Sequence, residues 1–120
     1  YAAFLRQMEF DETGIQTALE RARTAASSNI ASQSPMFDLQ RKQAARNIDN
    51  EAESRGMFRS GRRLERRSEA RDAIDLNQRR FEEGQRNSVL GAEQTAADQI
   101  ARLRRQRAEQ ELSARNRLTV

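Results

Sequence analysis

Charged side chains make up 33% of this chain and aromatic side chains only 5%, a balance that limits how large a core the chain can build. Of its 22 basic residues 21 are Arg, and they alternate with 18 carboxylates over a background of Ala, Gln and Ser. These residue types favour or tolerate helix, whereas charged side chains are almost never fully buried. The sequence therefore predicts long helices that complete their burial against other chains.

Length and hydropathy support this prediction. The chain has 120 residues, enough for one domain, but only 36% of them are hydrophobic and the mean hydropathy is −0.99. Those values are low for an independent globular domain. The sequence begins at Tyr1 without an initiator Met, so we expect it to be a fragment of a larger chain.

Composition excludes several kinds of chemistry. Cys and His are both absent, which removes disulfides, thiolate and imidazole ligands, and the commonest general base at neutral pH. No local catalytic motif appears, so we expect a protein that is not an enzyme, with no cofactor and no metal. No run approaches the roughly 18 apolar residues of a membrane span, and no signal peptide is recognisable, so we expect a soluble protein without a membrane span.

The clearest pattern is an apolar heptad spacing over residues 1–30, interrupted only by Glu12. It predicts an N-terminal helical segment whose apolar seam packs on other helices. The expected seam residues of this segment are Leu5, Met8, Ile15 and Leu19. Residues 13–16 (TGIQ) match a capping box, so the helix either continues through Gly14 or restarts there.

A run of small polar residues that contains the only Pro predicts a helix break near 29–35. Ser34 is a suitable N-cap, and Pro35 is a suitable first residue of a new helix. That middle helix is expected over residues 36–55, with a thin apolar stripe. Its stripe residues are Phe37, Ala44, Ala45, Ile48 and Ala52.

A second break is expected near 56–60, where two glycines flank an apolar pair. The stretch that follows contains no Pro and predicts a long C-terminal helix over residues 61–118. At roughly 1.5 Å per residue, such a helix is too long to be buried inside a monomer of this size. Its expected seam residues are Ile74, Phe81, Ile100 and Leu103. The alternative is a solvated helix that frays without a partner. The predicted fold class is all-α, with long helices forming an oligomeric coiled coil or helical bundle.

Basic residues cluster just after the second break. The cluster consists of Arg59, Arg62, Arg63, Arg66 and Arg67. Like charges four residues apart repel on a helix, so the cluster needs a negative partner. Carboxylates of packed helices and phosphate are the alternatives, beside plain solvation. The net charge of +4 is too mild for a dedicated nucleic-acid arm, so carboxylates are favoured.

The run AESRGMFRSGRRLERR at residues 52–67, with the Ala/Gln/Arg-rich residues after it, resembles helical virion proteins of tailed bacteriophages. The resemblance lies in an Arg-Gly-apolar-x-Ser-Gly step between such helices. It implies a structural protein of the tail or tail tip in the virion, often trimeric, with other virion proteins as partners. It carries no catalytic residues, and residues 1–35 lie outside it.

Two function classes follow. The leading hypothesis is a non-enzymatic structural protein of a phage virion that forms a homo-oligomer by coiled-coil packing. The alternative is a nucleic-acid-associated helical protein whose Arg clusters bind phosphate. The second such cluster consists of Arg102, Arg104, Arg105 and Arg107.

Overall fold

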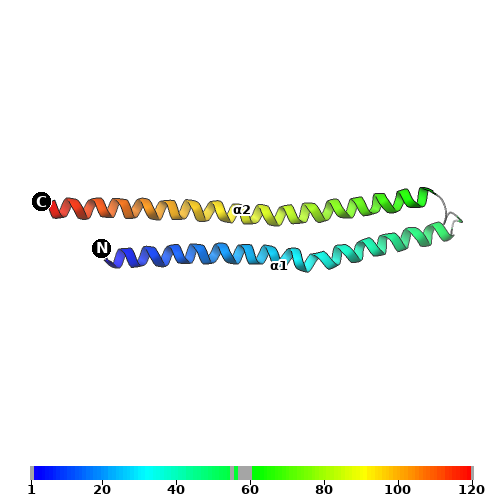
Figure 1. Cartoon of the computed structure of the whole chain (residues 1–120), viewed down its shortest axis with the longest axis horizontal. Coiled ribbons are helices and arrows are strands. Elements are labelled where there is room, and N and C mark those ends of the chain that lie inside the picture. The colour runs from blue at the N-terminus through cyan, green and yellow to red at the C-terminus, as the bar shows by residue number, and fades with distance from the viewer. Residues whose placement is uncertain (1, 55, 57–60, 120) are drawn as a thin grey trace. The chain divides into compact units, whose positions relative to one another are not determined.

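The computed structural model describes residues 2–54, 56 and 61–119. These residues form two helices, α1 (Ala2–Ser54) and α2 (Gly61–Thr119), and no strand is found among them (Figure 1). The predicted all-α fold class is confirmed, and α2 begins at the residue expected from the sequence. Along the described residues, neither helix has an apolar stretch long enough to cross a membrane.

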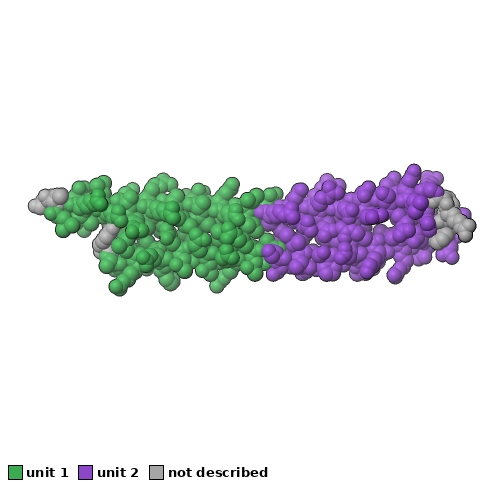
Figure 2. All heavy atoms as spheres, in the orientation of Figure 1, with its two compact units in different colours: residues 1–26, 87–120 green, residues 27–86 purple. Residues whose placement is uncertain are grey.

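The chain divides into two compact units, and each unit combines a segment of α1 with a segment of α2 (Figure 2). Unit 1 consists of Tyr1–Ala26 and Asn87–Val120, and unit 2 of Ser27–Arg86. In unit 1, an early residue of α1 contacts a late residue of α2: Glu12 lies 3.8 Å from Arg104. Further along α1, Arg23 lies 3.3 Å from Glu93. The two segments of unit 1 are therefore antiparallel.

Unit 2 is antiparallel for the same reason. Arg41 contacts Asp75 at 2.8 Å, whereas Asp49, later in α1, lies 3.7 Å from Arg63, earlier in α2. The α1 and α2 segments of this unit are joined through residues 55–60, so the chain reverses direction between them. The long C-terminal helix thus gains part of its cover from its own chain.

The break expected near 29–35 is wrong, because α1 continues through Pro35 and joins the two segments expected over 1–30 and 36–55. An interior Pro costs a helix about 3 kcal/mol. Contacts with α2 on both sides of Pro35 offset that cost. Before it, the Asn29 amide donates to Gln85 at 3.1 Å, and after it, the buried Phe37 ring lies 6.1 Å from the Phe81 ring.

Of the two alternatives at residues 13–16, the continuous helix is the one observed, and α1 runs through Gly14 without a capping box. The Thr13 hydroxyl donates to the Glu9 carbonyl at 2.9 Å, and the Thr17 hydroxyl donates to the Thr13 carbonyl at 2.9 Å. Such bonds to a preceding carbonyl are typical of Thr inside a helix. Thr13 therefore acts as an interior residue and not as a cap.

The break expected near 56–60 begins as predicted at Gly56, while residues 57–60 lie outside the described part of the chain. Gly56 has a φ of 70°, in the left-handed region, and its N–H donates to the Glu53 carbonyl at 3.1 Å. A left-handed glycine just beyond the last turn is a common way to end a helix, because it has no Cβ to clash. Gly56 therefore explains why α1 ends at Ser54.

The less exposed side chains of both helices follow a 4-3-4 spacing that repeats every eleven residues. The line along α1 is Ile15, Leu19, Ala22, Ala26, Ile30, Gln33, Phe37, Arg41, Ala44, Ile48 and Ala52. The line along α2 is Arg63, Arg67, Ala70, Ile74, Gln78, Phe81, Gln85, Val89, Ala92, Ala96, Ile100 and Leu103. The heptad spacing predicted within residues 1–30 ends at Ala26, and positions 29 and 36, which would continue it, are exposed. An eleven-residue repeat averages about 3.67 residues per turn and corresponds to a right-handed supercoil.

Two glycine substitutions should have opposite effects. Gly56→Ala should lower the free energy of unfolding by about 1 kcal/mol, because a side chain strains the left-handed conformation. Gly84→Ala should raise it by about 0.5–1 kcal/mol, because Gly84 lies inside α2 and an added Cβ meets nothing within 4 Å. Urea denaturation at one protein concentration measures both. A gain in stability from Gly56→Ala would contradict the helix end described above.

Candidate assembly interface

The seam residues expected near the two chain ends come together in unit 1. Met8 and Leu19 are buried, with 6% and 8% of their surface exposed. The other four are half-buried: Leu5, Ile15, Ile100 and Leu103. Ile15 and Leu103 line one groove, so these two seam residues face each other from α1 and α2. The seam is thus first a contact within the chain, which corrects the expectation that Met8 and Leu19 need other chains for cover.

Unit 2 contains the remaining two expected seam residues, Ile74 and Phe81, both half-buried. Phe81 contacts Phe37 with the ring planes tilted by 53°, an arrangement that aromatic pairs favour. Phe37 and Ala52, which the sequence placed in the thin apolar stripe, are buried. The apolar core of this unit is therefore narrow and rests on one aromatic pair.

A polar network lies beside that pair, and the sequence analysis did not find it. Arg41 occupies the seam, eleven residues after Ile30 and eleven before Ala52. Its Nε donates to Asp75 Oδ1 at 2.8 Å, and its Nη2 donates to Gln78 Oε1. A third bond, from Nη1 to Asp38 Oδ1 at 2.9 Å, holds the side chain along α1. The signal for Arg41 was the eleven-residue spacing, which a search for heptads misses.

The basic cluster after the break meets carboxylates of its own chain. Arg63 and Arg67 lie 3.7 and 3.8 Å from the same oxygen of Asp49, and Arg66 lies 3.2 Å from Glu51. Arg63 and Arg67 lie four residues apart and repel each other, and the Asp49 carboxylate between their guanidinium groups reduces this repulsion. Arg62 is exposed, and Arg59 lies outside the described residues.

Ion pairs also join the helices of unit 1. Arg23 donates to Glu20 at 2.7 Å and to Glu93 at 3.3 Å. The hydrogen bond to Glu20, and then that to Glu93, raises the pKa of Arg23 above its usual value, so this guanidinium stays charged. Arg104 of the second basic cluster lies 3.8 Å from Glu12 and is largely exposed, so this pair contributes little energy and mainly favours one alignment.

Unit 1 carries grooves on both sides of its seam. One, of about 540 Å³, is lined by Phe10, Gly14, Ile15, Ala18 and Leu103 with polar residues at its edges. The other is lined by Glu9, Glu12, Thr13, Gln16, Thr17, Ile100 and Arg104 and is more polar. Over residues 2–54, 56 and 61–119, no three metal-ligating side chains come together.

Comparison of this chain with known protein families, with curated proteins and with solved structures gives no match. Its function is therefore argued from the helix contacts themselves.

The Arg41 network should contribute to the stability of unit 2. Asp75→Ala removes a carboxylate that accepts from the guanidinium, and should lower the free energy of unfolding by about 1–2 kcal/mol. Glu83→Ala, at an exposed position of the same helix, serves as the control and should change it by less than about 0.5 kcal/mol. Thermal denaturation of both variants at equal protein concentration makes the comparison. Equal losses would show that the network is not stabilising.

Proposed function

We propose that this chain is a non-enzymatic structural protein that assembles with further copies of itself by packing helix against helix. The observation that carries the proposal is the thinness of its core. Six described residues are buried, all apolar, and four of them are small or flexible: Met8, Ala26, Ala52 and Ala96. No described side chain is fully buried, so each seam residue keeps surface that a further helix can cover.

Exposed apolar side chains support the same proposal. Among the described residues, large apolar side chains lie exposed on both helices, including Phe10, Leu64, Leu112 and Leu118. Association would remove this apolar surface from water.

The ion pairs favour a structural role over phosphate binding. Arg63, Arg66 and Arg67 lie beside carboxylates, so binding a phosphate there would require breaking contacts already made. The resemblance of residues 52–67 to virion helices of tailed phages fits this role and implies an assembly in a tail or tail tip.

Assembly predicts that stability depends on concentration. Sedimentation equilibrium should give a mass of two or more times 13.8 kDa. The melting temperature, followed by circular dichroism, should rise with protein concentration. Because apolar burial drives the association, moderate salt should weaken it little. A monomer mass with a constant melting temperature over a hundredfold dilution would exclude the proposal.

Nucleic-acid binding is the second candidate, and the exposed Arg62 and Arg104 are the observation in its favour. Changing Arg62, Arg63, Arg66 and Arg67 to Gln should destabilise the helix pair of unit 2 through the lost ion pairs and leave retention of DNA or RNA low and unchanged. Filter binding at several salt concentrations is the measurement, because phosphate contacts weaken steeply with salt. Tight, salt-sensitive binding that the substitutions abolish, with assembly intact, would favour the alternative.

A further inference from the structure

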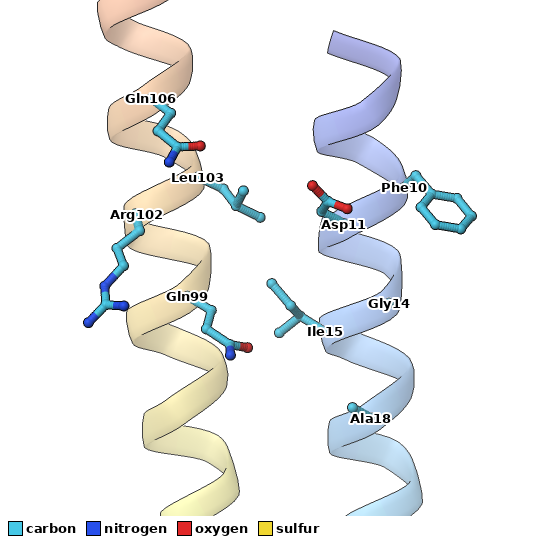
Figure 3. Close-up of a pocket in the computed structure, with 9 residues that line it drawn as sticks. All are labelled: Phe10, Asp11, Gly14, Ile15, Ala18, Gln99, Arg102, Leu103 and Gln106. Atoms are coloured by element: carbon cyan, nitrogen blue, oxygen red, sulfur yellow. The ribbon is translucent and has the colours of Figure 1, made fainter. Parts of the chain in front are cut away.

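The apolar groove of unit 1 combines features of a surface that is covered by protein. Ile15 and Leu103 point toward each other between the helices and form its floor, as Figure 3 shows. Phe10 lies at the outer edge of α1 with its ring turned away from α2, and 73% of its surface is exposed. Exposed aromatic side chains beside an apolar floor are typical of binding surfaces, since they bury much apolar area when a partner docks.

A second feature of the groove is the open space beside Gly14. An added Cβ at Gly14 meets nothing within 4 Å, as at the other glycines of α1 and α2, and Gly14 also lines the groove. A glycine there costs the helix about 0.5–1 kcal/mol relative to Ala, with no turn or strained backbone in its own chain to require it. The missing side chain leaves the groove open to a side chain from outside.

The two sides of the seam differ in charge. The other groove of unit 1 is flanked by the ion pair of Glu12 with Arg104, so its charged side chains already contact each other. The apolar groove carries Asp11 on the α1 wall, where it accepts a hydrogen bond from Gln7 Nε2 at 3.1 Å, and Arg102 on the α2 wall. Arg102 is exposed and points away from α1 (Figure 3). Opposite charges on opposite walls make this surface complementary to a copy of itself.

We infer that a second copy of this chain docks on the apolar groove, groove against groove, about a two-fold axis parallel to the helices. Such an axis lays the α1 segment of each copy over the α2 segment of the other, as an isologous contact requires. Asp11 of each copy then faces Arg102 of the other, and Phe10 packs on the flank of the opposing helix pair. The inference rests on the proposed self-assembly and specifies its contact surface.

Reciprocal charge reversal tests the two-fold contact. Asp11→Arg alone places Arg against Arg twice in each dimer, and Arg102→Asp alone places Asp against Asp twice. Each variant should dimerise at least about tenfold more weakly than the wild-type chain at low salt. An equimolar mixture of the two variants restores both opposite-charge contacts, so it should dimerise to within about threefold of the wild-type affinity. Sedimentation velocity of the three samples measures this.

A pair of matched substitutions tests the groove itself. Gly14→Gln places a long side chain over the floor and should weaken dimerisation about tenfold or more, although it improves helix propensity. Thr17→Gln introduces the same side chain on the other side of the seam and should leave dimerisation unchanged. Circular dichroism of both variants checks that helix content is kept.

The outcomes separate this inference from the proposed function. Oligomers that form equally well in every variant, or a trimer of the wild-type chain, would overturn the groove contact while self-assembly stands. A wild-type chain that stays monomeric at all concentrations would overturn both. Selective loss with the groove variants, together with rescue in the mixture, supports both.

Discussion

The contact between α1 and α2 depends on a single line of side chains, about one from each turn of each helix. Because that line repeats every eleven residues, it stays on one face over many turns without the left-handed winding of a heptad coil. Few of its members are large: Phe37 and Phe81 form an aromatic pair, and Ala fills many other positions. Apolar burial of this kind draws the helices together but distinguishes poorly between neighbouring alignments, since one Ala packs much like another.

Polar contacts supply what the apolar line lacks. In unit 2, Arg41 reaches both Asp75 and Gln78, and Asn29 donates to Gln85. In unit 1, Arg23 reaches Glu93. Each of these contacts is lost if one segment slides by a turn, and polar residues in a helix seam commonly fix register in this way at some cost in stability. A chain one third charged can therefore specify an alignment that its few apolar side chains do not.

The sequence predicted the all-α class, a helix break beginning at Gly56, and the apolar face of α1 that contains the buried Met8, Leu19 and Phe37. Composition and local spacing determine these features. The helix break that the sequence predicted near Pro35 is absent, because contacts of Asn29 and Phe37 with α2 outweigh the local tendency of Pro to end a helix. The sequence also assigned the seam to other chains, because residues distant in sequence, such as Ile15 and Leu103, become neighbours only once the chain has reversed. The Arg41 network was missed for the same reason, since spacing alone does not indicate which carboxylate an Arg will meet.

Pro35 has a further consequence for the motions of α1. Its ring nitrogen has no hydrogen, so the carbonyl of Ala31 has no amide donor four residues ahead and must turn to water, which its exposed position allows. Amides of the adjoining turns are then the ones most readily opened, because local opening begins where a helix has lost a bond. Among the interior amides of α1, hydrogen exchange would be fastest there, well away from both helix ends. α1 is one continuous helix in the structure, but its stretches on either side of Pro35 would thus open separately.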